Sequence, residues 1–232
     1  MTKTDISKRV WEIDFARGIL IILMTILHTL FNLEYFYSIP INYSSGFVNI
    51  IRIMVASSFI LVSGISTSFS RSSFKRGMIV LFAALMVTFA SYIFNSTGYI
   101  SFGILHMLSI CMISSHLIKR LKTHAIFLLS IILGLSVFIL PYIKVTSNYF
   151  FMFGLYTNSF ISLDYYPLIP WSGLFVFGIG ISKVIYKKKI SIFKMRLSDN
   201  VINFFGRHSL LIYLVHQPVI LFLMYVGSKF IL

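Results

Sequence analysis

Apolar residues fill seven long stretches of this chain, and short polar connectors separate them. The stretches cover residues 11–32, 47–69, 76–94, 100–117, 124–143, 167–186 and 208–230. Each is close to the roughly 20 residues that a helix needs to cross a bilayer. The pattern therefore predicts an all-α, polytopic membrane helix bundle of seven transmembrane helices, built as a single domain over residues 1–232. The first stretch lacks a small-residue cleavage site, so we expect a spanning helix and no cleavable signal peptide.

Two connectors have patterns of their own. Residues 144–166 are rich in Tyr and Phe, side chains that favour the membrane interface. Two interpretations remain open for them, a re-entrant segment and a surface-lying segment that caps one face of the bundle. Residues 190–206 combine apolar and basic positions and predict an amphipathic stretch that lies in the opposite interface.

The charge pattern orients the predicted helices. The chain is 58% hydrophobic and 11% charged, whereas a soluble domain has about 25% charged residues. Its net charge is +14, and most of the basic residues lie before the first stretch or after the second, fourth and sixth. Lys144 is the only basic residue in the alternate connectors, which cover residues 33–46, 95–99 and 144–166. The positive-inside rule then places the N-terminus in the cytoplasm and the C-terminus outside the cell membrane.

The same charges bear on partners. Basic residues in short connectors orient a membrane protein and contact anionic lipid head groups, so the lipid bilayer is the expected partner. Nucleic acid is not, because no base-reading module occurs in the chain. Cys111 is the only cysteine, which excludes a disulfide within the chain and a cysteine-based metal cluster. HxxxH and HExxH spacings are also absent, so we expect no metal.

Arg17 and His28 are polar residues inside the first apolar stretch. An ionisable residue there is by default a functional-site hypothesis. Eleven residues at 100° each return to within about 20° of the starting direction, so the two side chains share a helix face about 16 Å apart. Asp14 is three residues before Arg17 and can meet it on that face, either as an ion pair that eases insertion or to orient the guanidinium toward a phosphate. Gly18 allows a backbone or a ligand to approach closely.

His28 lies in the outer half of the first stretch, and three other polar residues are expected near its depth. They are Glu34, His106 and Asp164. An imidazole with a carboxylate available suits proton removal from a hydroxyl or amine, with His106, Glu34 or Asp164 orienting His28. The alternative is that His28 is a hydrogen-bonded packing residue.

Two further groups of residues complete the candidate site. Arg52 lies just inside the outer end of the second stretch. It either extends outward to the interface or pairs with Glu34 or Asp164. Together with Tyr165 and Tyr166, Arg52 is a candidate for binding the acceptor. Arg207 and His208 begin the last stretch near the predicted phosphate end. His216 lies about two turns deeper and, with Arg207 and His208, is a candidate for binding the donor. Alternatively, His216 and Gln217 satisfy the carbonyl near Leu214 that Pro218 leaves open.

Five sequence motifs resemble a known family. They are Trp11–Gly18 (WEIDFARG) running to His28, Phe59–Ser66 (FILVSGIS), Phe102–Met107 (FGILHM), Asp164–Trp171 (DYYPLIPW) and Gly206–Pro218 (GRHSLLIYLVHQP). In this order they resemble the bacterial and archaeal proteins grouped under the heparan-α-glucosaminide N-acetyltransferase catalytic domain, over nearly the whole chain. The Arg17–His28 spacing also resembles the first helix of the acyltransferase-3 family of polysaccharide O-acetyltransferases.

The resemblance implies a function. Members of both groups move an acyl group from cytoplasmic acyl-CoA through the membrane to an acceptor on the far side, often a sugar. By these resemblances the chain is a membrane acetyltransferase with acetyl-CoA as co-substrate and a glycan-like acceptor. The resemblance to the acyltransferase-3 family implies that His28 is its catalytic histidine. The phosphates of the donor would be bound by Arg17 and Arg207. The non-enzymatic alternative is a small transporter or lipid-binding membrane protein whose pathway the same polar residues line. The oligomeric state is open, with a homodimer as one expectation.

Overall fold

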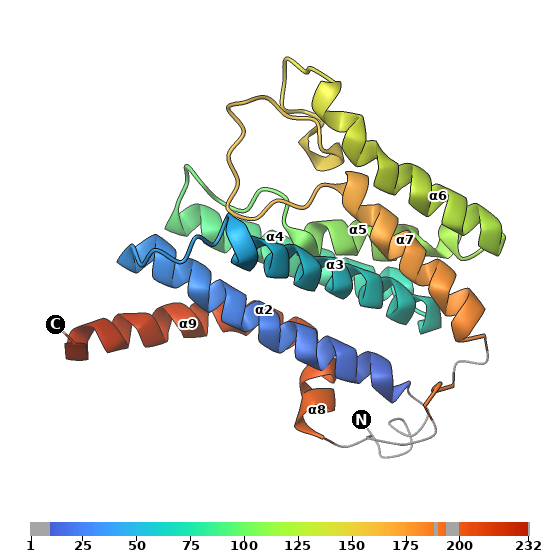
Figure 1. Ribbon diagram of the computed structural model, residues 1–232, viewed down its shortest axis with the longest axis horizontal. Helices are drawn as coiled ribbons and strands as arrows, with labels where there is room; N and C mark the ends of the chain where they lie inside the picture. The colour runs from blue at the N-terminus through green and yellow to red at the C-terminus, as the bar shows by residue number, and fades with distance from the viewer. Residues whose placement is uncertain (1–9, 188–189, 194–199, 232) are drawn as a thin grey trace. The chain divides into compact units, whose positions relative to one another are not determined.

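A computed structural model describes residues 10–187, 190–193 and 200–231, and its regular elements there are helices (Figure 1). The α-helices are α2 (Trp11–Tyr37), α3 (Gly46–Phe69), α4 (Ser73–Phe94), α5 (Ile104–Ile118), α6 (Thr123–Leu135), α7 (Leu168–Ile185), α8 (Val201–Arg207) and α9 (Ser209–Ile231). Short 3₁₀ turns cover Ser136–Phe138, Leu140–Tyr142 and Phe151–Phe153.

The predicted all-α membrane bundle is confirmed. Five helices, α2, α3, α4, α7 and α9, are long and apolar enough to cross a membrane, and α5 and α6 are shorter apolar helices. Together they coincide with the seven predicted stretches. The α6 stretch is shorter than predicted because the helix gives way to 3₁₀ turns before Pro141, a residue that lacks a backbone N–H and disfavours a helical residue before it. Of the predicted amphipathic stretch 190–206, residues 201–207 form α8, and 194–199 lie outside the described residues.

The chain divides into two compact units. The first contains residues 1–59 and 189–232, and the second contains residues 60–188, so the division falls within α3. That the whole chain acts as a single domain stays a prediction.

In the first unit, α2 packs against α8 and α9. Two glycines allow the backbones to touch: a Cβ at Gly18 would collide with the carbonyl of Ile202, and one at Gly206 with the carbonyl of Asp14. Further along, Asn32 pairs with Gln217, and the Tyr37 hydroxyl donates to the Met224 carbonyl at 2.9 Å. The residue numbers of these contacts increase in the same direction along both helices. The helices α2 and α9 therefore run parallel, as expected for the first and last of an odd number of spans.

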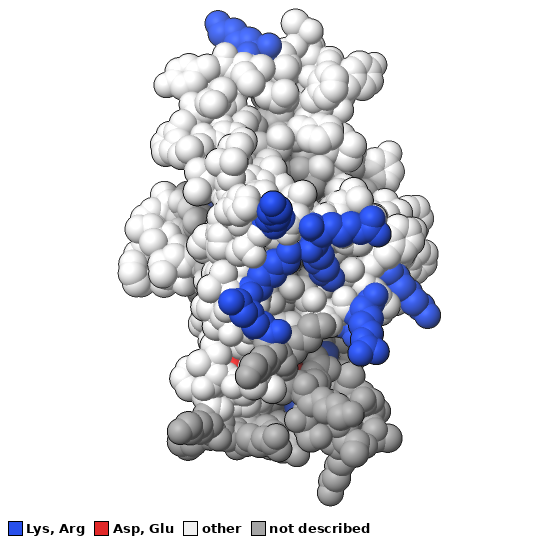
Figure 2. All heavy atoms as spheres, turned by 90° about the vertical axis from the view of Figure 1, so that its right-hand side faces the viewer, with Lys and Arg blue, Asp and Glu red and all other residues white. Residues whose placement is uncertain are grey.

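In the second unit, α4 packs against α5, and α6 against α7. The basic connectors of this unit meet at one of its ends. The Lys119 ammonium donates to the Ser70 carbonyl at 3.2 Å, and the Lys183 ammonium donates to the carbonyls of Lys119 and Leu121 at 2.8 and 2.7 Å. Figure 2 looks onto an end where Lys and Arg side chains gather. The connectors that the sequence identified as basic are therefore also close together in space within this unit.

Candidate active site

Two histidines from different helices face each other in the first unit. The rings of His28, on α2, and His216, on α9, have centroids 4.9 Å apart and planes at 70°. His216 is 8% exposed, and both residues lie within helices apolar enough to span a membrane. The parallel packing of α2 and α9 thus brings together two imidazoles that are 188 residues apart in the sequence.

The hydrogen bond of His216 defines which ring nitrogen is available. Its Nδ1 lies 2.5 Å from the Tyr213 carbonyl oxygen. A carbonyl only accepts, so Nδ1 carries the hydrogen, and in the neutral ring Nε2 carries the lone pair. That Nε2 is buried and has no hydrogen-bond partner in the described part of the chain. The arrangement presents a basic nitrogen next to His28.

A pair of amides lies on the same two helices. The Gln217 Nε2 donates to the Asn32 Oδ1 at 2.9 Å, and Asn32 is fully buried. The second donor, Asn32 Nδ2, and the second acceptor, Gln217 Oε1, have no partner among residues 10–187, 190–193 and 200–231. Exchanging O and N in both amides leaves the same inventory, one open donor and one open acceptor. Each buried unsatisfied group costs about 1–3 kcal/mol, a cost typical of a functional site.

The alternative role for His216 and Gln217 can now be judged. They were alternatively expected to satisfy the carbonyl near Leu214 that Pro218 leaves open. Instead, His216 bonds to the carbonyl of Tyr213, and Gln217 bonds to Asn32. The His216 side chain is thus directed at the Tyr213 carbonyl, and the Gln217 side chain at Asn32 on α2. The alternative role is therefore wrong for Gln217.

The predicted phosphate-binding residues gather where α2 begins. Asp14 is 5% exposed, and its carbonyl lies against Gly206, the neighbour of Arg207. His208 stacks on Phe204, with ring centroids 4.3 Å apart, and its Nδ1 lies 2.9 Å from the Phe204 carbonyl oxygen. The first turns of α2, which carry Asp14 and Arg17, and the end of α8 therefore lie in one packed region.

At Gly18, the close approach is made by a backbone. The chain segment that a Cβ would meet there is Ile202 of α8, which selects helix packing from the two alternatives that the sequence left open. A role of Gly18 in binding the donor stays a prediction.

Glu34 and Arg52 both attach to the connector after α2, and they do not pair with each other. The Glu34 Oε2 accepts the Tyr43 backbone N–H at 2.7 Å. The Arg52 guanidinium donates to the Asn49 Oδ1 at 2.7 and 3.2 Å and lies 5.7 Å from the Tyr43 ring centroid. Of the alternatives for Arg52, pairing with Glu34 is therefore wrong: the guanidinium bonds to Asn49, one turn earlier on α3, and Glu34 accepts the Tyr43 N–H.

His106 belongs to the second unit, where both of its ring nitrogens are engaged. Its Nδ1 accepts the Gly103 N–H at 3.2 Å, and its Nε2 lies 3.2 Å from the Thr88 hydroxyl oxygen. That hydroxyl already donates to the Ile100 carbonyl at 2.7 Å, so His106 Nε2 is the donor, and the ring is a neutral tautomer. The imidazole fixes the start of α5.

Asp164 lies at the same end of α5. Its Oδ2 accepts the Ile104 N–H at 3.4 Å and lies where a Cβ of Gly103 would fall. The structure thus brings Asp164 and His106 to the start of one helix, and the contacts there assign chemistry to neither.

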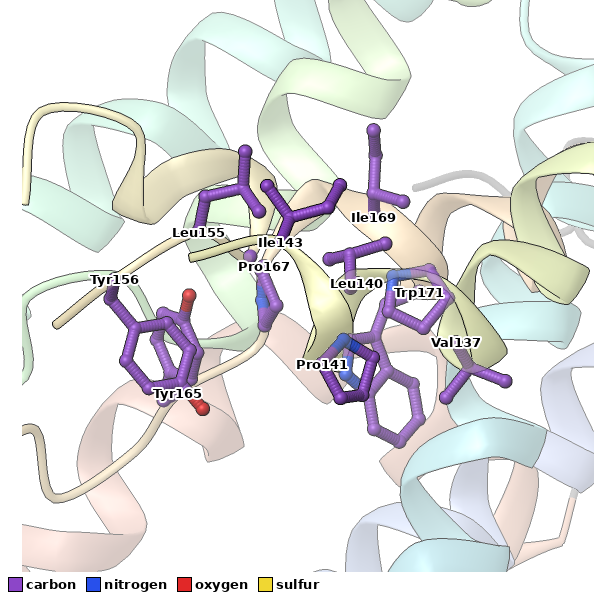
Figure 3. A pocket seen from close by; sticks show the side chains of 12 residues that line it. Val137, Leu140, Pro141, Ile143, Leu155, Tyr156, Tyr165, Pro167, Ile169 and Trp171 are labelled. Atoms are coloured by element: carbon purple, nitrogen blue, oxygen red, sulfur yellow. The ribbon is translucent and has the colours of Figure 1, made fainter. Parts of the chain in front are cut away.

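The two tyrosines after Asp164 have different surroundings. The Tyr165 hydroxyl donates to the Phe151 carbonyl at 2.6 Å, and burial, followed by the neighbouring Tyr156, raises the pKa of Tyr165 above its ordinary value. Tyr166 is buried, with its ring centroid 4.9 Å from that of Trp171. Tyr165 and Trp171 line a cavity of about 420 Å³ in this unit (Figure 3).

Sequence reasoning missed Asn32. It follows His28 by one helical turn on the same face, and an amide at this spacing within an apolar stretch was the available signal. No cluster of three or more His, Cys, Asp or Glu that could hold a metal occurs among the residues that the structure describes.

The comparisons with known proteins support the resemblance. A family model described as heparan-alpha-glucosaminide N-acetyltransferase, catalytic, matches residues 9–218. Neither a curated protein nor a solved structure matches. The matched region runs from the start of α2 to just beyond the His216–Gln217 pair. Because it covers most of the chain, this protein belongs to the family of the heparan-α-glucosaminide N-acetyltransferase catalytic domain, a family of acetyltransferase-type membrane enzymes.

Proposed function

We propose that this protein transfers an acetyl group from cytoplasmic acetyl-CoA to a hydroxyl or amine of an extracytoplasmic, glycan-like acceptor. Membership of the acetyltransferase family supports the reaction class. The observation that carries the proposal is the His28–His216 pair, with an open Nε2 on His216 inside the membrane-spanning part of the chain. An exposed catalytic base would serve a soluble reaction, whereas a base at this depth suits a donor that reaches into the membrane.

The donor would enter at the α2–α8 end. Arg17 supplies a fork of N–H donors that suits a phosphate, and Arg207 and His208 lie at the end of α8, which packs against the start of α2. Asp14 positions Arg17. Along α2, Arg17 and His28 are separated by about 16 Å, a length that an extended pantetheine arm can cover.

The histidine pair would carry the proton transfer. One imidazole removes the proton from the acceptor hydroxyl or amine while the acceptor oxygen or nitrogen attacks the thioester carbonyl. The tetrahedral intermediate then expels the thiolate of CoA, which takes that proton and leaves as the free thiol. The proton balance closes, and both imidazoles return to the neutral form. We assign the base role to His28 and the partner role to His216, with Glu34 and Arg52 on the acceptor side.

The amide pair would stabilise the intermediate. Whichever way the amides of Asn32 and Gln217 are turned, one N–H stays open. A buried N–H that is already positioned can donate to the oxyanion as charge develops on it. His106 and Asp164 hold the start of α5, and we assign them a structural role there.

A small transporter is the second candidate function. Pro218 within α9 and the open polar groups beside it would also suit a substrate pathway through the bundle. The two functions differ in whether a thioester is consumed.

Reconstituted protein decides between them. Proteoliposomes receive acetyl-CoA on one face and a panel of sugar and amine acceptors on the other, and free CoA thiol is measured with and without acceptor. Acceptor-dependent thiol release supports the transferase. Acceptor movement across the membrane with intact acetyl-CoA would establish the transporter and refute the transferase.

A further inference from the structure

The cavity in the second unit has a composition unlike that of the histidine pair. Twelve residues line it, and they are aliphatic, proline or aromatic apart from Gly154. Figure 3 shows Tyr156 and Tyr165 at one end and Trp171 with Val137 at the other. The rings of Tyr156 and Tyr165 have centroids 5.2 Å apart and planes at 85°. At about 420 Å³, the cavity falls within the usual range of ligand pockets.

Its place in the unit indicates that it opens toward lipid. The lining comes from the residues after α6 and from the first residues of α7, whereas Lys183, near the other end of α7, lies among the basic connectors. Large apolar side chains around the lining are exposed: Val137 is 47%, Phe138 71% and Ile139 61% exposed. Exposed apolar side chains in a membrane helix face acyl chains, so the wall of the cavity borders the bilayer.

A single cation lies next to this wall. Lys144 directly follows Ile143, which lines the cavity, and neighbouring Cα atoms are about 3.8 Å apart. Lys144 is exposed, and it is the only basic residue in connector 144–166. Asp164 is the only acidic residue between positions 60 and 188, and its Oδ2 accepts the Ile104 N–H. The charge beside the cavity is therefore left for an anion from outside the unit.

We propose that this cavity binds one anionic membrane lipid, with an apolar chain against Trp171 and Val137 and a phosphate head group at Lys144. A chamber lined by aliphatic and aromatic side chains beside one ammonium matches a molecule with a long apolar part and a phosphate at its end. A free phosphate would use Lys144 and leave the chamber unused, and a neutral lipid would use the chamber and leave Lys144 unused.

The chain contains two tryptophans, which gives a local probe. In a Trp11→Phe variant, Trp171 is the only tryptophan. This variant, full length and in nanodiscs, is titrated with brominated phosphatidylglycerol or brominated phosphatidylcholine at equal mole fractions, and tryptophan quenching is measured. We expect phosphatidylglycerol to reach half-maximal quenching at a mole fraction at least twofold lower. Lys144→Gln should remove this difference, and Lys229→Gln, a lysine in the first unit, should retain it.

Two further arms test the apolar chamber and the source of the phosphate. Val137→Phe narrows the chamber at an exposed position and should weaken quenching by phosphatidylglycerol, while soluble glycerol-3-phosphate should not compete. Equal quenching by the two lipids in the parent, or a preference that survives Lys144→Gln, would overturn the proposal. Competition by glycerol-3-phosphate would replace the lipid with a soluble anion.

Discussion

The two buried histidine clusters of this protein differ in how completely their hydrogen bonds are made. In the second unit, His106 uses one nitrogen for Gly103 and the other for Thr88. In the first unit, His216 uses Nδ1 for a backbone carbonyl and keeps Nε2 open. Both residues are histidines in apolar helices, and both lie in motifs that the family match covers. Residue type and burial therefore do not distinguish the two histidines. What distinguishes a histidine that holds structure from one that is available for chemistry is whether both of its ring nitrogens have a hydrogen-bond partner.

The largest expected effect separates the two clusters by activity. His28→Ala should lower acetyl transfer by a factor of about 10² to 10⁴, the usual cost of losing a general base, and His216→Ala should also lower it strongly. His106→Ala should retain turnover per folded molecule. Release of CoA thiol, normalised to monodisperse protein, is the measurement. Near-parental turnover of both His28→Ala and His216→Ala would show that the first cluster takes no part in the mechanism. Loss of activity in His106→Ala alone would assign the catalytic role to the second cluster instead.

The second expected effect concerns the donor. Arg17→Ala should weaken CoA binding, because each charge-assisted hydrogen bond to a phosphate contributes about 1.5–3 kcal/mol. Isothermal titration of the purified protein with CoA measures it. Arg52→Ala is the matched control, since the partners of Arg52 are Asn49 and Tyr43, and it should leave CoA affinity unchanged. Equal losses in the two variants would mean that general charge, and not a phosphate site at Arg17, determines binding.

The third prediction tests the packing of α8 against α2 in the unit that holds the histidine pair. Gly206→Ala should destabilise the first unit by about 1–3 kcal/mol, the usual cost of overpacking, because its Cβ would collide with the Asp14 carbonyl. Gly227→Ala, also in that unit, has nothing within 4 Å of its Cβ and serves as the control. Thermal unfolding in one detergent compares them, and equal melting temperatures would show that the α2–α8 contact is looser than the structure gives.

The fourth prediction, similar in size to the third, tests the structural role of His106. Thr88→Val removes the acceptor for His106 Nε2–H and leaves that buried donor unpaired, which costs about 1–3 kcal/mol. Thr97→Val is the control, because that hydroxyl bonds Asn95 in an exposed connector. We expect Thr88→Val to lower the melting temperature and leave CoA release per folded molecule unchanged. An unchanged melting temperature would contradict the hydrogen-bond network described for His106.

Much of the fold could be predicted because membrane helices are encoded locally. The seven apolar stretches predicted all seven hydrophobic helices, since about 20 apolar residues in lipid must satisfy their backbone groups within a helix. The alternation of basic connectors predicted the end of the second unit where Lys119 and Lys183 meet. The end of α6 was predicted less well, because the effect of Pro141 competes with an apolar pattern that continues to residue 143.

The sequence by itself determined the spans, their charge asymmetry, the family motifs and the list of polar residues that need an explanation. It could place Arg17 and His28 on one face because both belong to one helix of known pitch. The tertiary structure was needed to show that His216 faces His28 and that Asn32 pairs with Gln217. The physical reason is that helix pitch is a local property, whereas contacts between helices depend on which backbones can approach one another, as the glycines at positions 18 and 206 allow for α2 and α8.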